Sequence, residues 1–541
     1  MDFIFGTLAT DELKMIHHRV LRRGVQHNHD MSPRDPRPNE AVTLTVRVGQ
    51  DVDADHVSVY YTIDGSSPMG KRGAALRGKA LELTRVDYVW DTLAWAYVAV
   101  WVGTLPPQLE GAIVRYRIGA WSSSHKDEVF ADYPEFKATT ERAAAAFFRG
   151  EPVPQDLPPA TARADTFTFH VDNYESPRWA KQAVIYQIFV DRFYPGNGRE
   201  WLEPDDLMGF FGGTLWGVHD KLDYLADLGV SCIWLTPIFP SPTHHGYDAT
   251  DYFHVEPRLG GDEALHAVVE AAHARDIRVL LDLACSHLSD QHPYFIEAKN
   301  DPKSACREFF TFDDSDPNGY RTFFGVASMP SINFQSVAAR AWLCDVAQYW
   351  LREFDVDGYR LDHANGPGPD FWADFQAACK EIKPDCLCFG EVVETPDVLR
   401  AYIGRLDGLL DFQVEDALRK TYAFGTMTER DLEKLLERHY AYFPSEFIMP
   451  TFLDNHDMDR FLYVANGDKN ALRRAAAAQM RLPNPPIIYY GTEVGLSQHQ
   501  GKNDAGWGLE VSRLPMLWGA EQDHSLLTFY KGLITARRSA F

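Results

Sequence analysis

Apolar and polar residues alternate over short stretches between about residues 40 and 150, which is the pattern of half-buried strands. Residues 42–48 (VTLTVRV) place valine or leucine at every second position, and residues 57–61 (VSVYY) lead into the turn DGSSP. A later stretch, 113–118 (IVRYRI), has the same character. Short strands separated by turns predict a β-sandwich, which we assign to residues 1–150. We expect Trp90, Trp95 and Trp101 in its core.

A proline-rich stretch follows this region. Residues 150–165, GEPVPQDLPPATARAD, contain four prolines and few large apolar side chains. Such a composition is typical of a connection between domains, so we predict a linker over residues 151–177.

From residue 178 onward, apolar runs of strand length alternate with longer helical patterns such as residues 262–276 and 337–354. Eight such units in about 360 residues predict an α/β fold, a (β/α)₈ barrel over residues 178–541. A doubly wound sheet is the alternative, but no glycine-rich phosphate fingerprint follows the first run. The strand-like runs are AVIYQIFV, CIWLTP, RVLLDLA, DGYRLD, LCFGE, GLLDF, FIMPTFLDN and PIIYYG.

One connection in the predicted barrel is unusually long. About fifty residues, 286–335, separate the third strand from its helix and are rich in Asp, Pro, Phe and Ser. Because long insertions on the loop side of a barrel are usually functional, we expect an inserted subdomain that takes part in the site.

Charge and composition limit the partners. The net charge of −24 disfavours nucleic acid and anionic lipid but is compatible with a neutral substrate. No apolar run is long enough to cross a membrane, and the first residues do not resemble a signal peptide. The seven cysteines are an odd number between Cys232 and Cys388, and most lie in apolar runs. We therefore predict a cytoplasmic protein with reduced, buried thiols rather than a disulfide framework or a Cys386–Cys388 metal pair.

Acidic and basic side chains gather where the predicted strands end. In a barrel of this kind, the chemistry lies at the carboxyl ends of the strands. Any one of these groups alone is better explained as a cap, a surface group or a structural ion pair, but their recurrence at successive strand ends indicates a site. They are Asp282 and His287 after the third strand, Arg360 and Asp362 at the fourth, Glu391 at the fifth, and Asp454, His456 and Asp457 at the seventh.

Converging carboxyl groups suit the cleavage of a glycosidic bond, whose transition state carries positive charge. Arg360 and Asp362 are two residues apart, so both side chains point to the same face of the strand. The arginine would keep Asp362 ionised, as a nucleophile requires. Glu391, close to other acids, would stay protonated as a general acid, and Asp457 would stabilise the cationic sugar. We expect His287 and His456 to bind sugar hydroxyls and Tyr247 to stack on a sugar ring.

Several of these stretches resemble motifs of the α-amylase family of glycoside hydrolases, from about Trp179 to Phe541. The matching stretches are LLDLACSH, GYRLDHAN, FGEV and FLDNHD, flanked by FFGGTLWGV and PPIIYYGTE. The resemblance implies a nucleophile at Asp362, a general acid/base at Glu391 and a transition-state stabiliser at Asp457. It also implies a sugar-binding site lined by Arg360, His287, His456, Tyr247 and Asp282.

The stretch MPSIN, residues 329–333, resembles the Met-Pro-x-Leu-Asn stretch of neopullulanases, cyclomaltodextrinases and maltogenic amylases. An N-terminal β-domain is typical of this group, either as a carbohydrate-binding type of module or as a dimerisation domain. The resemblance implies an intracellular enzyme that acts on cyclodextrins, maltooligosaccharides or pullulan. It also implies a homodimer formed through the N-terminal domain.

The sequence departs from the family pattern at a few positions. Ser286 replaces an asparagine that binds calcium in secreted members, which argues against calcium, and no cofactor is expected to be required. Gly366 replaces a glutamate of the group, which leaves substrate preference and transglycosylation open. NDAGWGLEVSRLPM loosely matches the group's substrate clamp and implies substrate binding by Asp504. The family continues into a small C-terminal β-domain, which we expect this chain to lack.

Three functions therefore stand in order. The leading one is retaining hydrolysis of α-1,4-glucosidic bonds in cyclodextrins or maltooligosaccharides. The same acids would serve a transglycosylase or isomerase. A non-catalytic carbohydrate-binding relative is the third, and the presence of all three acids argues against it.

Overall fold

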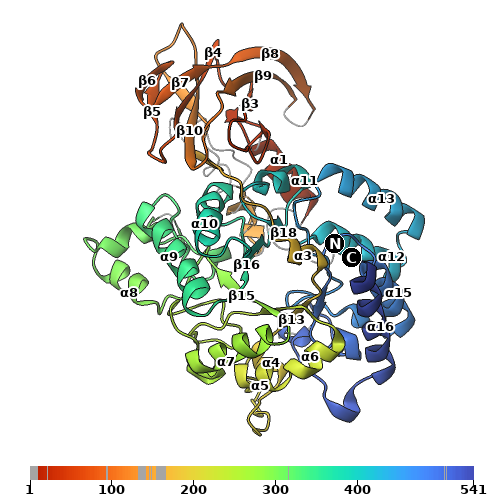
Figure 1. Cartoon of the computed structure of the whole chain (residues 1–541). Helices are drawn as coiled ribbons and strands as arrows, with labels where there is room; N and C mark the ends of the chain where they lie inside the picture. The colour runs from red at the N-terminus through yellow and green to blue at the C-terminus, as the bar shows by residue number, and fades with distance from the viewer. Residues whose placement is uncertain are drawn as a thin grey trace.

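The N-terminal part of the chain is a sandwich of two antiparallel sheets, at the top of Figure 1. The computed structural model describes residues 10–540 apart from 21, 93–94, 132–139, 141, 145, 148, 154–165, 315, 505 and 507. One sheet has the order β1-β3-β9-β8 with β2 also on β3, and the other has β11-β10-β4-β7 with β12 also on β10. Valine, leucine and isoleucine side chains of both sheets pack into one core, so the predicted sandwich is confirmed. The strands are β1 (Val25–Gln26), β2 (Met31–Ser32), β3 (Val42–Val48), β4 (His56–Thr62), β7 (Lys79–Glu82), β8 (Thr84–Asp91), β9 (Ala96–Leu105), β10 (Ala112–Trp121), β11 (Glu128–Phe130) and β12 (Phe167–Val171).

The last strand of the sandwich comes from the range predicted as a linker. β12 pairs antiparallel with β10, with Val171 opposite Ala112 and Phe167 opposite Tyr116. The alternation FTFHV buries both phenylalanines in the sandwich core, which is why this stretch is a strand. Residues 154–165 of the predicted linker lie outside the described residues.

The hairpin of β8 and β9 extends beyond the sandwich core. β8 is an edge strand, and none of its residues is buried. Trp90 is 46% exposed and Trp95 is 74% exposed, whereas Trp101 is 5% exposed. The prediction of a core position is therefore confirmed for Trp101 and wrong for Trp90 and Trp95. These two indoles sit where the hairpin curves away from the facing sheet (Figure 1).

The second part of the chain is the predicted barrel. Its parallel strands follow the order β18-β17-β16-β15-β14-β13-β19, so chain neighbours are also spatial neighbours. Residues 448–451 close the ring between β18 and β19, because Gly408 bridges to Ile448 and Thr451 bridges to Pro486. The strands are β13 (Ile185–Ile188), β14 (Cys232–Leu235), β15 (Arg278–Ala284), β16 (Gly358–Asp362), β17 (Leu387–Gly390), β18 (Gly408–Leu409) and β19 (Ile487–Tyr489).

The seventh barrel position forms only single bridges instead of a regular strand. Pro450 lies within it and has no N–H to donate to a ladder. The backbones also come very close, since a Cβ on Gly408 would lie 1.6 Å from the carbonyl oxygen of Ile448. Only glycine fits at this contact.

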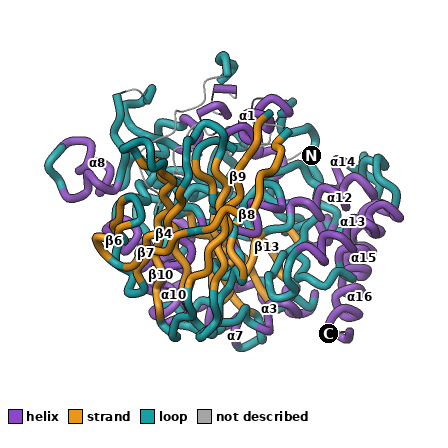
Figure 2. The backbone as a smooth tube through the Cα atoms, turned by 90° about the horizontal axis from the view of Figure 1, so that it is seen from above, coloured by secondary structure: helices purple, strands orange, loops and turns teal. Residues whose placement is uncertain are grey.

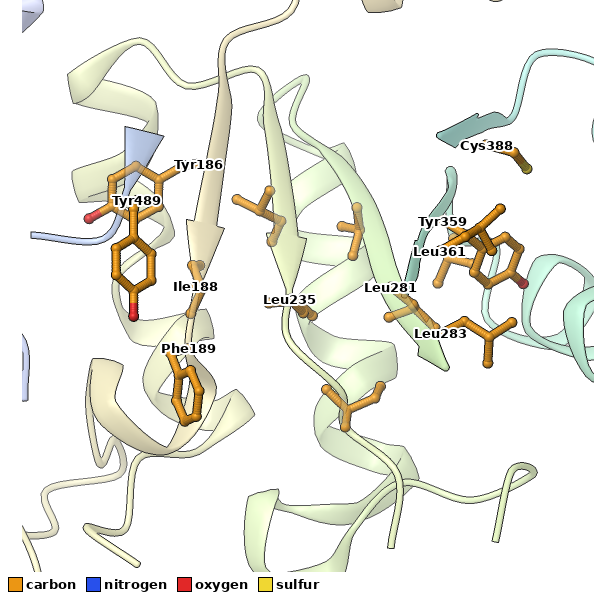
Figure 3. Close-up of a cluster of buried hydrophobic side chains, with 14 of the residues drawn as sticks. Tyr186, Ile188, Phe189, Leu235, Leu281, Leu283, Tyr359, Leu361, Cys388 and Tyr489 are labelled. Carbon is orange, nitrogen blue, oxygen red and sulfur yellow. The ribbon is translucent and has the colours of Figure 1, made fainter. Parts of the chain in front are cut away.

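Alternate residues of the barrel strands face two different layers. Tyr186, Leu235, Leu281 and Tyr359 point outward into the layer between strands and helices, as Figure 3 shows. The residues of the other parity, such as Trp234, fill the barrel interior. Because side chains alternate along a strand, Asp282, Arg360 and Asp362 share the interior face, and their position at the strand ends brings them to its mouth.

Helices cover the outside of the barrel. The predicted helices 262–276 and 337–354 are confirmed as α7 and α9. Seen from above, the sandwich strands cross in front, and α12, α13, α15 and α16 gather to one side (Figure 2). The helices are α1 (Asp11–Val20) before the sandwich, then α3 (Arg178–Gln182), α4 (Val190–Phe193), α5 (Leu215–Asp220), α6 (Leu222–Leu228), α7 (Gly261–His273), α8 (Pro293–Asn300), α9 (Val337–Glu353), α10 (Pro369–Ile382), α11 (Pro396–Leu399), α12 (Phe412–Tyr422), α13 (Glu429–Tyr442), α14 (Phe461–Val464), α15 (Lys469–Gln479) and α16 (His524–Ala540).

The long connection after β15 has its own small structure. It contains α8 and two 3₁₀ turns, η3 (Ala305–Phe309) and η4 (Phe323–Gly325). Single bridges, including one from His287 to Ser331, tie the two ends of the connection together. The insertion is therefore anchored directly beside the end of β15.

The sandwich rests on α10, the helix that follows the β16 loop. Asp374 on α10 accepts hydrogen bonds from Arg115 (3.0 Å) and His170 (2.9 Å) of the sandwich. Asp370, in the first turn of α10, accepts from the backbone N–H of Thr168 (2.6 Å) and pairs with His29 (3.1 Å). The two domains therefore meet through buried or half-buried carboxylates of one helix.

Candidate active site

One guanidinium organises the mouth of the barrel. Arg360 at the end of β16 is fully buried, and a buried charge needs partners. Its Nη1 lies 2.8 Å from Asp282 Oδ1 and 2.9 Å from Asp362 Oδ1, and its Nη2 lies 2.9 Å from Glu391 Oε2. Three carboxyl groups from β15, β16 and the end of β17 thus meet around one cation. The arrangement follows from register, since Asp282 lies opposite Arg360 and Gly390 opposite Leu361.

Two of these carboxyl groups differ in acidity. Burial raises the pKa of Asp362 to about 6, and the positive charge of Arg360 opposes this rise. Burial raises the pKa of Glu391 further, to about 8, and the negative charges of Asp362 and Asp457 add to the effect. At neutral pH this order leaves Asp362 ionised and Glu391 protonated.

Asp282 is held by donors on every side. Tyr247 Oη donates to its Oδ2 over 2.9 Å, and Trp234 Nε1 donates to the same oxygen over 3.0 Å. Burial raises the pKa of Asp282 to about 7, while these donors and Arg360 stabilise the carboxylate. Asp282 therefore fixes the orientation of Arg360 and Tyr247.

Asp457 has a different environment. Arg513 Nη2 donates to its Oδ1 over 3.0 Å, and His456 Nε2 lies 3.1 Å from its Oδ2. Burial alone would raise the pKa of Asp457, but the charges of His456 and Arg513 outweigh it and lower the pKa below the ordinary value. Asp457 is therefore an ionised carboxylate at the mouth of the barrel.

His456 and Tyr247 form a stacked pair beside these acids. Their ring centroids are 5.5 Å apart and nearly parallel, and Tyr247 Oη lies 2.5 Å from His456 Nε2. Gln187 on β13 contacts the other ring nitrogen over 2.7 Å. Burial lowers the pKa of His456 to about 3, so the ring is neutral at ordinary pH.

His287 has a nitrogen that the protein leaves unsatisfied. Its Nδ1 contacts Ser286 Oγ over 2.8 Å, but its Nε2 is buried without a hydrogen-bond partner among the described residues. Burial lowers the pKa of His287 to about 4, so the ring is neutral. Nε and Nη2 of Arg360 are likewise buried without a hydrogen-bond partner in the described part of the chain. Buried polar atoms of this kind suit hydroxyl groups of a ligand.

The structure brings together eight of the nine predicted site residues and leaves Asp504 apart. Asp504 is exposed on a loop, and its carboxylate accepts from the backbone N–H of Gly501 over 3.1 Å. Arg513 and Lys502 reach Asp457 instead, the lysine through the Asp457 carbonyl oxygen. The motifs gave no signal for Arg513, because it lies 56 residues from Asp457 along the chain.

Two further observations bear on cofactors and membranes. Among the described residues, no three or more His, Cys, Asp or Glu side chains are arranged to hold a metal ion. Within the same part of the chain, none of the helices combines the length and the apolar character needed to cross a bilayer.

Comparison with known proteins agrees with this geometry. A family model described as "Alpha amylase, catalytic domain" matches residues 187–529. Alpha-amylase 2 of Dictyoglomus thermophilum is 39% identical over 371 residues, 68% of this chain and 65% of that protein. The intracellular maltogenic amylase of Bacillus subtilis is 35% identical over 390 residues, 69% of this chain and 64% of that protein. The alignments therefore span slightly less than two thirds of these relatives' lengths.

A solved structure of a cyclomaltodextrinase extends the likeness beyond the barrel. It superposes with a TM-score of 0.63 at 26% identity, over 95% of this chain and 84% of that one. The match therefore includes the sandwich as well as the barrel, and the predicted resemblance to this group is confirmed.

Proposed function

The chain belongs to the α-amylase family of glycoside hydrolases, and from this premise we propose that it hydrolyses α-1,4-glucosidic bonds with retention of configuration. The proposed substrates are small α-glucans, namely cyclodextrins and maltooligosaccharides. The printed names of the similar proteins, a maltogenic amylase and a cyclomaltodextrinase, support this class of substrate.

The observation that carries the proposal is the pairing of two carboxyl groups of different acidity on Arg360. Asp362 is the nucleophile: its carboxylate attacks the anomeric carbon and forms a glycosyl ester. Glu391 is the general acid: it gives its proton to the glycosidic oxygen as the bond to the leaving sugar breaks. In the second step Glu391 takes a proton from water, the water oxygen bonds to the anomeric carbon, and Asp362 is released.

Asp457 stabilises the positive charge that develops on the sugar between these steps. Its low pKa supports this role, since Arg513 and His456 keep it ionised throughout. A protonated group at this position would give no such stabilisation.

The remaining residues position the sugar. His287 and Arg360 offer buried nitrogens that lack hydrogen-bond partners in the described part of the chain, which supports hydrogen bonds to sugar hydroxyls. Tyr247 presents its ring next to His456 and supports stacking on the sugar. Asp282 acts on the sugar through Arg360 and Tyr247. We keep Asp504 only as a weak candidate, because it is exposed.

The N-terminal sandwich is proposed to form a homodimer interface. Its edge strand β8 exposes unpaired backbone groups together with Tyr88 and Trp90, and Tyr97 on β9 is 62% exposed. A cytoplasmic location is proposed on two grounds. All seven cysteines are free, and one relative carries the word intracellular in its name.

A product profile tests the function. β-Cyclodextrin, maltotriose, pullulan and soluble starch are incubated with the wild type and with Asp362→Asn, and the sugars are separated over time. We expect maltose and glucose from cyclodextrin faster than from starch, and no products from the variant. New longer or rearranged sugars would instead favour the transglycosylase, and products from Asp362→Asn equal to those of the wild type would reject the assigned nucleophile.

A further inference from the structure

Two residues with left-handed backbone conformation face each other at the rim of the catalytic carboxyl groups. His363, directly after Asp362, has φ 41°, and Phe324 in the inserted subdomain has φ 45°. Neither is a glycine, and such conformations persist in side-chain-bearing residues only where their surroundings impose them. Backbone strain of this kind concentrates at functional sites, so we asked what the two side chains do.

The two side chains belong to one aromatic cluster. The His363 ring meets Phe323 at 5.0 Å and Phe324 at 5.2 Å, edge to face in both cases. Phe323 also stacks on His287 at 4.3 Å. We call Phe323, Phe324 and His363 the aromatic wall. All three are half-buried, so part of each ring is open to solvent.

The wall touches the general acid. The backbone N–H of His363 donates to Glu391 Oε2 over 3.2 Å. Arg360, Asp282 and His456 lie fully buried below, on the other side of the carboxyl groups. A sugar held by those buried groups therefore has its leaving partner on the outer side of Glu391, where the wall stands.

The loop after β16 is shaped to accept the His363 ring. A Cβ on Gly366 would lie 2.6 Å from Ser286 Cβ and 3.1 Å from His363 Cδ2. A side chain at residue 366 would therefore displace the ring or the end of β15. Ser286 and Gly366, the two departures from the family pattern, are thus in contact with each other, and Gly366 makes room for His363.

From this geometry we propose that the aromatic wall binds the sugar on the leaving side of the scissile bond, and equally an incoming acceptor sugar. The proposal rests on the proposed function and names a specificity surface of the same site. Aromatic rings offer large, rigid apolar area against which the C–H face of a pyranose packs. An exposed ring pair at the rim serves this purpose without hydrogen-bonding a particular hydroxyl.

The wall then decides what the glycosyl ester on Asp362 reacts with. When water attacks, its oxygen bonds to the anomeric carbon, the ester bond breaks and Glu391 takes the proton. When a sugar on the wall attacks, its hydroxyl oxygen forms the new glycosidic bond and Glu391 takes the hydroxyl proton instead. Losing the wall should therefore lower transfer relative to hydrolysis.

The test uses α-maltosyl fluoride as donor and maltose as acceptor, and it measures the ratio of transfer product to hydrolysis product. This ratio does not depend on the fraction of correctly folded enzyme. Phe324→Ala removes one ring, and His363→Gly removes the other while tolerating the left-handed backbone. We expect each to lower the ratio about tenfold, the lower range for loss of a hydrophobic contact. Val326→Ala, at a residue of the same loop that is 42% exposed, is the control and should leave the ratio unchanged.

An unchanged ratio in both ring variants, or a wild type that releases fluoride without any transfer product, would overturn the proposal while leaving the proposed hydrolase intact. A wild type that releases no fluoride would defeat the proposed function, and the assignment of the wall with it. Gly366→Ala gives an independent check, since it should lower the ratio by displacing the His363 ring.

Discussion

Arg513 donates from Nη2 to Oδ1 of Asp457 over 3.0 Å, and from Nη1 to Glu510 over 2.7 Å. The arginine is buried and lies just after a 3₁₀ turn, η7 (Gly508–Ser512). Because its charge keeps the pKa of Asp457 low, it supports the assigned stabiliser without belonging to any catalytic motif.

Replacing Arg513 with alanine should reduce kcat/KM about 100-fold, the usual effect of losing one preorganised electrostatic contact. Arg513→Lys keeps the charge and should recover part of the loss. Because the alanine also leaves Glu510 unpaired, thermal unfolding of both variants must be compared with that of Arg473→Ala, an exposed arginine. An Arg513→Ala enzyme as active as the Arg473→Ala control would remove the arginine from the catalytic account.

Activity should depend on pH as a bell-shaped curve. The rising limb of kcat/KM is expected near pH 6, where Asp362 loses its proton, and the falling limb near pH 8, where Glu391 loses its own. The sign follows from the roles, since the nucleophile must be ionised and the acid protonated. Initial rates on maltotriose between pH 4 and pH 10 measure the curve. Activity that keeps rising above pH 9 would contradict a protonated Glu391.

Glu391→Gln should separate the two steps of the reaction. Maltotriose needs a proton on its leaving oxygen, so its turnover should fall by about 10²–10⁴-fold, the usual share of general acid catalysis. α-Maltosyl fluoride needs no such proton, so the ester on Asp362 should form and accumulate. Azide, which attacks without a general base, should restore turnover as a glycosyl azide of retained configuration. The matched variant Asp362→Asn should show no turnover of either substrate, and equal losses on both substrates in Glu391→Gln would contradict the assignment.

The sequence predicted the barrel and the three acids because both depend on local pattern. Strand-length apolar runs end in Asp362 and Glu391, and the period of two places Arg360 beside Asp362 on one face. The seventh strand was harder, since FIMPTFLDN reads as a strand while Pro450 limits it to single bridges.

Contacts between distant segments could not be predicted from pattern alone. Arg513 joins Asp457 across 56 residues, and its approach depends on a loop whose path no periodicity specifies. The linker boundary failed for a related reason, because β12 is a short run whose partner β10 lies far back in the chain. Trp90 and Trp95 look like core residues by composition, but their burial depends on whether a second sheet reaches them.

Asp370→Asn should loosen the sandwich from the barrel. Against the opposing effect of burial, His29 and Arg405 keep the pKa of Asp370 below its ordinary value. This carboxylate therefore contributes stability at pH values above the unfolded pKa, and the contribution disappears as the pH falls through the folded pKa. At pH 7 we expect a loss of about 1–3 kcal/mol, because His29 and the Thr168 N–H then share a weaker acceptor. Urea unfolding at pH 7 measures the loss, and a variant as stable as the wild type would show that the contact contributes nothing.

The exposed hairpin gives the last prediction, on assembly. β8 is an edge strand with no buried residue, and Trp90 contacts Tyr97 at 5.1 Å and Trp95 at 5.5 Å in one exposed cluster. Water contact with so much aromatic surface is unfavourable, so a second copy that covers it would gain stability. Sedimentation velocity over a range of protein concentrations should show a dimer for the wild type and a monomer for the double variant Trp95→Asp with Tyr97→Asp. Leu109→Asp, at another exposed apolar residue of the same domain, should remain dimeric. A dimer that survives the double variant would place the interface elsewhere, whereas a monomeric wild type would leave the cluster free to bind α-glucan chains, which titration with maltoheptaose would then detect.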